Sequence, residues 1–300
     1  MNTKIKSMMI LFLASIVWGF AFVAQRLGGN IGTYTFNALR FALGAVSLIP
    51  VIKVFEKDVD KQKAHKTIKP GILCGIFLFT ASTFQQYGVV LTDYAGKSGF
   101  ITDFYIILVP IFAMLLFKEK VNKQALIGAV ISIIGFYFLC INQSLTICLG
   151  DILLFVCAIF FAFHILAIDH FANNTYPLRL SLYQFATCSI LSFIASFIFE
   201  SYDIQAIKMA IIPILYGGIM SVGVGYTLQT IGQKDMDSTT SAIILSLESV
   251  FCSIGSVIFL KEVMTLQGYI GFILVFIGII IAQLPRITKT GYFLFLFEYN

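Results

Sequence analysis

Charged residues lie inside long apolar stretches of this chain, and two of them, Arg40 and Glu248, have side chains suited to binding a solute. A guanidinium can bind a carboxylate through two parallel hydrogen bonds. A carboxylate can bind an amine, or take up a proton where burial disfavours its charge. A charged side chain in the middle of a membrane span costs about 2.5–3.5 kcal/mol on insertion scales, so such residues tend to face a cavity or a partner. The two residues therefore predict a polar site for a small charged solute.

Each charged candidate also has a structural interpretation, and the sequence leaves both open. Arg40 could form an internal ion pair with Asp103, which lies at a comparable depth in another stretch. It could also extend along the helix to the membrane surface. Glu248 could form a structural hydrogen bond to a neighbouring helix. His164 could relay protons together with Glu248, or it could be a hydrogen-bonded histidine between helices.

Amide and aromatic side chains complete the set of candidates. An amide in hydrocarbon needs a hydrogen-bond partner, and aromatic rings can form the walls of a pocket, although in a chain with 15% aromatic residues most rings only pack. We expect no metal and no cofactor. The candidate substrate-binding residues are Trp18, Asn37, Arg40, Gln85, Tyr105, Tyr183, Gln184, Tyr226, Gln229 and Glu248.

The elements that must position these residues are membrane spans. Hydrophobic residues make up 59% of the chain, charged residues only 12%, and the mean hydropathy is +0.93. A soluble domain carries about 25% charged residues, so the composition predicts an all-α integral membrane protein. A bilayer core of about 30 Å needs roughly 20 apolar residues per helix. Windows of that length predict ten transmembrane helices over residues 8–26, 33–53, 70–91, 98–117, 124–141, 149–168, 179–199, 210–231, 239–260 and 266–284.

The same pattern occurs twice in the chain, 143 residues apart. Lys118-Glu119 is followed by Gln124, Gly128 and Gly135, and Lys261-Glu262 is followed by Gln267, Gly271 and Gly278. Weaker matches link residues 18–20 with 161–163, and Phe84-Gln85 with Leu228-Gln229. The repeat predicts two five-helix halves, residues 8–141 and 149–284, followed by a cytoplasmic tail over residues 285–300.

The basic residues predict the orientation of the spans. With the N-terminus in the cytoplasm, 15 Lys and Arg residues fall in inner segments and 4 in outer segments. Because each half holds an odd number of spans, the halves cross the membrane in opposite senses. We therefore expect two inverted-topology repeats in the cell membrane, with both termini in the cytoplasm and a site near the midplane between the repeats.

Several segments resemble the ten-span EamA branch of the drug/metabolite transporter superfamily. The resemblance is carried by residues 18–23 with Arg26, by Arg40-Phe41, by residues 99–102 with Pro110 and Lys118-Glu119, and by residues 246–250 with Lys261-Glu262. Many relatives carry Pro where this chain has Ser249. The resemblance implies a secondary transporter of small metabolites, often an exporter.

Together these features predict alternating-access transport of a small metabolite such as an amino acid or a similar zwitterion. One alternative is efflux of cationic or lipophilic drugs, for which a lone carboxylate among aromatic rings would suffice. A channel or a structural membrane subunit is a further alternative. The chain lacks an HExxH motif, paired catalytic aspartates and a Ser–His arrangement, so we expect no enzyme. The expected partners are the solute, the lipid bilayer and a second copy of the chain in a homodimer, without nucleic acid.

Overall fold

The structure of the protein is a computed structural model that describes residues 3–57, 59–92, 95–118, 123–140, 148–261 and 266–283. In these ranges every regular element is a helix. The expected C-terminal tail, Glu119 and Glu262 lie outside them. The elements are α1 (Thr3–Leu27), α2 (Thr33–Phe55), α3 (Lys61–Lys66), α4 (Ile68–Leu91), α5 (Ala95–Thr102), α6 (Tyr105–Phe117), α7 (Lys123–Cys140), α8 (Leu149–Ala172), α9 (Pro177–Phe199), α10 (Ile204–Met209), α11 (Ile211–Leu215), η1 (Tyr216–Tyr226), α12 (Thr227–Gln233), α13 (Ser238–Leu245), α14 (Glu248–Gly255), η2 (Ser256–Leu260) and α15 (Leu266–Gln283).

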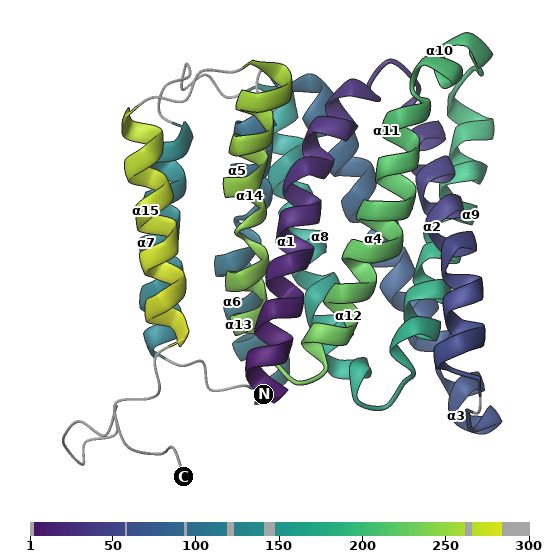
Figure 1. Cartoon of the computed structure of the whole chain (residues 1–300), viewed down its shortest axis with the longest axis horizontal. Coiled ribbons are helices and arrows are strands. Elements are labelled where there is room, and N and C mark those ends of the chain that lie inside the picture. Colours follow the sequence, from purple (N-terminus) through teal and green to yellow (C-terminus); the bar gives the residue numbers. More distant parts are fainter. Residues whose placement is uncertain are drawn as a thin grey trace.

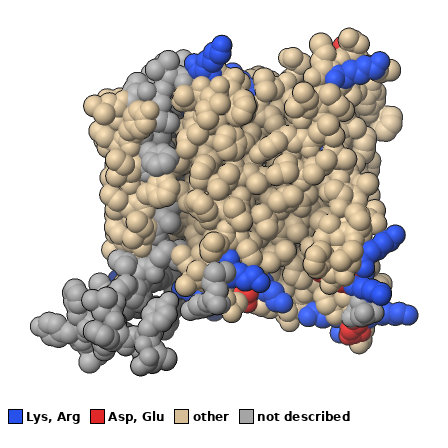
Figure 2. Space-filling model, in the orientation of Figure 1, with Lys and Arg blue, Asp and Glu red and all other residues tan. Residues whose placement is uncertain are grey.

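Eight helical segments of the described chain are long and apolar enough to cross a membrane. Charged residues gather at the two ends of the helices in Figure 2, and the face between them carries few. This arrangement is that of a multi-pass membrane protein. The predicted fifth and tenth spans appear as α7 and α15, whose apolar parts within the described residues, Lys123–Gly135 and Tyr269–Gly278, fall short of a full span. The count of ten spans therefore stays a prediction.

Helices that are equivalent in the two halves of the sequence pack against each other. α2 packs along α9, and α7 packs along α15, at opposite edges of the molecule (Figure 1). Glycines permit the close approach of α7 and α15: a Cβ on Gly135 would lie 2.7 Å from the Gly271 carbonyl oxygen. The repeated glycines of the sequence thus mark one inter-repeat seam.

The ends of α2 and α9 are joined by two reciprocal carboxylate caps. Glu200, just after α9, accepts hydrogen bonds at 2.8 Å from the backbone N–H groups of Tyr34 and Thr35 at the start of α2. Glu56, just after α2, accepts one at 3.0 Å from the Leu178 N–H at the start of α9. A carboxylate at a helix N-terminus satisfies unpaired N–H groups and is favoured by the helix dipole. The N-terminus of each helix is thus capped by a residue from the other half of the chain.

The cap at Glu56 also includes an ion pair. The Arg179 Nε lies 3.5 Å from Glu56 Oε2. Burial raises the pKa of Glu56, and the Leu178 N–H and the Arg179 guanidinium partly oppose that shift. The cap at Glu200 lacks a basic partner of this kind among the described residues and instead adds a hydrogen bond from the Thr35 hydroxyl.

The fourth and ninth predicted spans are each interrupted at equivalent positions, where continuous helices over 98–117 and 239–260 were expected. α5 and α6 meet at Asp103-Phe104, and α13 and α14 meet at Ser246-Leu247. The backbone tightens there, with hydrogen bonds spanning three residues such as Ile106 N–H to Asp103 O and Ser249 N–H to Ser246 O. Tightened turns within a helix often mark functional positions.

The repeated Lys residues have the same backbone conformation in both halves. Lys118 ends α6 with φ 54°, and Lys261 ends η2 with φ 57°, and they are the only non-glycine residues of positive φ in the described chain. This left-handed conformation is uncommon for lysine. The repeat in the sequence therefore corresponds to a repeated helix end, although α6 and α14 run in opposite directions in Figure 1.

Candidate functional site

A buried cavity lies between the two repeats. Its free volume is about 20 Å³, which is room for roughly one water molecule. Four elements of each half contribute to its walls, namely α1, α2, α4 and α6 from the first and α8, η1, α12 and α14 from the second. The lining residues are Trp18, Ala21, Phe22, Gln25, Arg40, Gln85, Tyr105, Phe161, Ile165, Ser221, Tyr226, Gln229 and Glu248.

Most of these residues form pairs that are equivalent in the two repeats. Tyr105 and Glu248 are 143 residues apart and hydrogen-bonded to each other. The remaining equivalent pairs, at an offset of 143 or 144 residues, are Trp18 with Phe161, Phe22 with Ile165, and Gln85 with Gln229. The cavity therefore lies where the two halves face each other, and the charged residues are positions at which the halves differ.

Arg40 provides the positive charge of the cavity, and its side chain is 1% exposed. Its Nε donates to the Asn37 side-chain oxygen at 3.0 Å, and its guanidinium lies 5.0 Å from the centroid of the Phe41 ring. Asn37 in turn donates to the Ser82 carbonyl oxygen at 3.1 Å. The Nη2 group is buried without a hydrogen-bond partner among the described residues. One donor of the guanidinium is therefore held ready for an acceptor.

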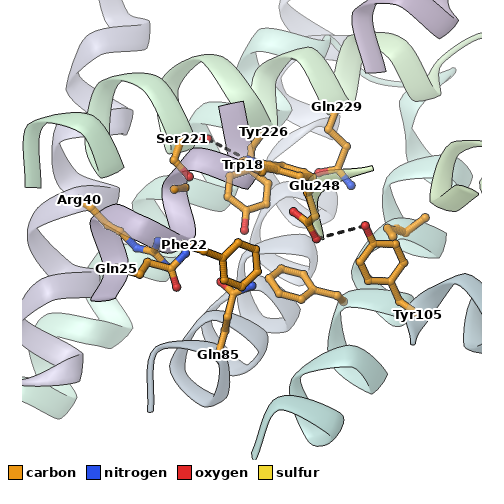
Figure 3. A pocket seen from close by; sticks show the side chains of 13 residues that line it. Trp18, Phe22, Gln25, Arg40, Gln85, Tyr105, Ser221, Tyr226, Gln229 and Glu248 are labelled. Atoms are coloured by element: carbon orange, nitrogen blue, oxygen red, sulfur yellow. Dashed lines mark hydrogen bonds between the residues drawn. The ribbon is translucent and has the colours of Figure 1, made fainter. Parts of the chain in front are cut away.

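Glu248 provides the negative charge, on the opposite side of the cavity from Arg40 (Figure 3). The Tyr105 hydroxyl donates to its Oε1 at 3.2 Å. Glu248 is the first residue of α14, directly after the interruption of the predicted ninth span. The two charges come from different repeats, α2 in the first and α14 in the second.

The expected ion pair between Arg40 and Asp103 is not formed. Asp103 is fully buried at the turn between α5 and α6, where it lies beside Glu248, Ser249 and Tyr105. In the described part of the chain, neither Arg40 nor Asp103 takes part in an ion pair. The prediction compared depth alone, whereas the interruption of the span directs Asp103 towards α14.

Aromatic rings separate the two charged sides of the cavity. The Trp18 and Tyr226 rings lie 4.6 Å apart between centroids. The Trp18 indole N–H donates to the Ser221 carbonyl oxygen at 3.1 Å, within the π-helix η1. A Cβ on Gly225 would overlap the indole nitrogen, so this glycine makes room for the ring. The indole is thus fixed by a hydrogen bond and by packing.

Four of the expected site residues do not line the cavity but support it or lie apart. Asn37 holds Arg40, as described above. Gln184 hydrogen-bonds the His164 ring at 2.7 Å and reaches Thr230 at 3.5 Å. His164 packs edge-on against Tyr226, with centroids 5.8 Å apart, and is not part of the cavity wall. Tyr183 contacts Gly71 at the junction of α4 and α9, away from the cavity.

Six lining residues were not expected from the sequence, although most of them carry a recognisable signal. Ala21, Phe22 and Gln25 follow Trp18 at intervals of three, four and seven residues, which is one face of a helix. Phe161 and Ile165 are the repeat equivalents of Trp18 and Phe22. Ser221 had no signal, because it contributes a backbone carbonyl exposed by the π-helix.

The cavity is equipped to bind a polar molecule. Besides Arg40 Nη2, the side-chain oxygens of Gln25 and Gln229 are buried without a hydrogen-bond partner in the described structure. Leaving a buried polar group unpaired costs about 1–3 kcal/mol, and a ligand that paired with these atoms would recover that free energy. Since the free volume is so small, side chains must move before anything larger than water enters.

Comparisons with known proteins agree with the duplicated architecture. The EamA-like transporter family model matches residues 5–141 and again residues 148–283. An uncharacterised transporter of Archaeoglobus fulgidus is 31% identical over 276 residues, covering 91% of this chain and 84% of the relative. A solved structure described only as "Crystal structure of protein" has a TM-score of 0.77 at 18% identity, and the match covers 93% of this chain and 96% of that one. The last match concerns the fold alone.

Proposed function

This chain belongs to the EamA-like transporter family and is a multi-pass membrane transporter, and we propose that it carries a small zwitterionic metabolite, an amino acid or a close analogue, by alternating access. The family match over two repeats confirms the resemblance stated from the sequence. The solute, the direction of transport and the mechanism belong to the proposal.

The observation that supports a zwitterion best is the placement of two opposite charges in one cavity. The Arg40 guanidinium offers an unpaired donor to a carboxylate, and Glu248 offers an acceptor to an amine. Gln229 and Gln25 add unpaired acceptors, and Trp18, Tyr226 and Phe22 provide apolar walls. Ion pairs in a water-poor site are worth more than in solution, so a zwitterion would satisfy both charges at once.

The proposal includes ten spans, with α7 and α15 as the fifth and tenth, and inverted repeats that rock around the central cavity. It places both termini in the cytoplasm and the protein in the cell membrane, on the distribution of basic residues. Export is the proposed direction, on the family resemblance alone. The small free volume of the cavity supports a closed state between the two open ones.

Thermal unfolding of the detergent-purified protein against amino acids, amines, carboxylates and sugars tests this function. A specific ligand stabilises by about 2.7 kcal/mol at a hundredfold excess over Kd, so zwitterions should raise the Tm. The rise should disappear in Arg40→Lys, which cannot form the bidentate pair, and in Glu248→Gln. A variant of the exposed cation Lys57, Lys57→Gln, is the matched control and should keep the rise.

Efflux of cationic, lipophilic molecules is the second candidate, and the aromatic walls around Glu248 favour it. In that case lipophilic cations alone should raise the Tm, and Arg40→Lys should leave the rise unchanged. Stabilisation by single carboxylates or sugars but not by zwitterions would contradict both candidates.

A further inference from the structure

The pair of acids Asp103 and Glu248 is not explained by solute binding. The two residues come from opposite repeats and lie beside each other at the two interrupted spans, 0% and 5% exposed. Glu248 lines the cavity, whereas Asp103 lies behind it. A single carboxylate would be enough to bind an amine, so the second acid calls for another role.

The described structure provides no basic partner for either acid. Its two ion pairs join Lys97 to Asp151 and Arg179 to Glu56. Glu248 accepts the Tyr105 hydroxyl, and neither oxygen of Asp103 accepts a well-aligned hydrogen bond. Two neighbouring carboxylates in apolar surroundings repel each other and are costly to desolvate, so they cannot both remain ionised. The pair therefore holds a proton.

The other titratable groups around the pair do not form an ion pair with either acid in the described structure. Tyrosine and cysteine are neutral near pH 7. The Lys97 ammonium on α5 is bonded to Asp151, and the Arg26 guanidinium on α1 to the carbonyl oxygens of Val89 and Thr92. Neighbouring α13 and η2 contain no titratable residue. The other titratable groups on the described elements around the pair are Tyr105 on α6, Cys252 on α14, Cys157 and His164 on α8, Tyr226 on η1 and Arg40 on α2.

An unpaired acceptor on the cavity wall, together with Glu248, offers a second contact to a ligand. The Gln229 side chain is 1% exposed, its Oε1 has no hydrogen-bond partner in the described residues, and it lines the cavity on the side of Glu248 (Figure 3). A cationic group entering there would meet both this oxygen and the Glu248 carboxylate. Its charge would replace that of the proton.

We propose that Asp103 and Glu248 form a proton site that shares one proton between the two carboxyl groups and releases it when a cationic group binds at Glu248. The O–H bond of the protonated carboxyl breaks, the proton passes to water in the cavity, and the cation compensates the second carboxylate. The release step rests on the proposed function, since it needs a cationic solute, but the proton site itself does not. The site would couple transport of the solute to a counterflow of protons.

The lone tryptophan of the chain reports on this site directly. Trp18 lines the same cavity as Glu248, so its emission should respond to the charge of the pair. Emission of the purified protein, excited selectively at tryptophan and without any solute, is followed from acidic to alkaline pH. Wild type should show one transition. Glu248→Gln and Asp103→Asn should each move it to lower pH by about one unit or more, because either change removes the like charge beside the remaining acid.

Three variants make the result specific. Asp60→Asn is the matched control, since Asp60 caps the surface helix α3 and Asn caps a helix about as well, so its transition should equal that of wild type. His164→Gln should also leave the transition in place. Tyr105→Phe keeps both acids and should shift the transition without abolishing it, which tests the site if either acid variant fails to fold.

The release step is tested in the same titration with methylammonium chloride against an equal concentration of sodium chloride. Methylammonium should move the wild-type transition to lower pH, and the shift should be absent in Glu248→Gln. The proton site would be overturned if wild type showed no transition, or if the transition survived both acid substitutions unchanged. Loss of the transition in His164→Gln instead would overturn it as well. A transition that responds to the acids but not to methylammonium would overturn the coupling and leave the proton site standing.

Discussion

The two cavity amides Gln85 and Gln229 occupy equivalent positions in the repeats, yet they need not bind the solute equally. Gln229 Oε1 is unpaired and lies on the side of Glu248. For whichever zwitterion raises the Tm, Gln229→Leu should weaken binding about tenfold, the equivalent of one hydrogen bond of about 1.4 kcal/mol. Titration of the ligand against Tm measures the change.

Gln233, one helical turn further along α12, is the matched control for that substitution. It is equally buried, but it donates to the Ile165 carbonyl oxygen and does not line the cavity. Gln233→Leu should therefore lower the Tm without changing the affinity. Equal loss of affinity in both variants would show that α12 acts through its packing and not through the Gln229 side chain.

Seven of the cavity-lining side chains were expected from the sequence, chiefly because charged and amide groups inside apolar spans are few. Arg40 and Glu248 were recognisable by their charge alone. The position of Asp103 was not predictable, because it depends on a tightened turn that the apolar sequence does not reveal. Tyr183 and Gln184 are consecutive, and a helix turns about 100° per residue; choosing the face requires knowing which neighbours α9 has.

Among the elements, the cap of α2 by Glu200 depends on a glycine. A Cβ on Gly32 would overlap the Glu200 carboxylate. Gly32→Ala should therefore displace the cap and destabilise the protein by about 1–2 kcal/mol, seen as a lower Tm. In a Glu200→Ala background the same change should cost much less, since the group that it displaces is already gone.

Gly96→Ala provides the control for this double-mutant comparison of Gly32 and Glu200. Among the described residues, a Cβ there would meet only the Ser253 hydroxyl, at 3.5 Å, an ordinary contact. In a helix Ala is favoured over Gly, so this variant should keep or raise the Tm. Strict additivity of Gly32→Ala and Glu200→Ala would show that the two residues do not act through the same contact.

The opposite cap gives a prediction on pH. A carboxyl group whose pKa is raised by folding stabilises the folded state most below its unfolded pKa, and that contribution is lost as the pH rises through the folded value. Burial raises the pKa of Glu56. As the pH rises from the unfolded to the folded pKa of Glu56, the Tm of wild type should therefore fall more steeply than that of Glu56→Gln. Parallel profiles of Tm against pH for the two proteins would contradict the raised pKa of Glu56.

Helix positions were predictable to within a few residues because hydropathy and the length of a span constrain them strongly. The interruptions at Asp103 and Ser246 were not, since the ninth span has no proline and Pro110 of the fourth lies inside α6, beyond the interruption. The reciprocal caps were equally hidden: Glu56 and Glu200 are 144 residues apart, and each looks like an ordinary loop acid. Only the packing of α2 against α9 brings each one to the other helix.

At the scale of the whole molecule, the two left-handed lysines should lie on opposite sides of the membrane. Lys118 and Lys261 end equivalent helices of the two repeats. In intact cells a membrane-impermeant maleimide should label Lys261→Cys but not Lys118→Cys, in a background whose native cysteines are replaced. Labelling of both from outside would contradict the inverted topology, and labelling of Lys118→Cys alone would reverse its orientation.

The exchange of caps between α2 and α9 has a consequence for how the protein is assembled. The N-terminus of each helix is capped by a glutamate from the other half of the sequence. The residues that line the cavity likewise come from both halves. If the gene were cut between the codons for residues 141 and 148, neither fragment alone could bury its own polar groups. Co-expressed, the fragments should associate and reconstitute one transporter. In that case, joining them in a single chain would guarantee equal numbers of two dissimilar halves.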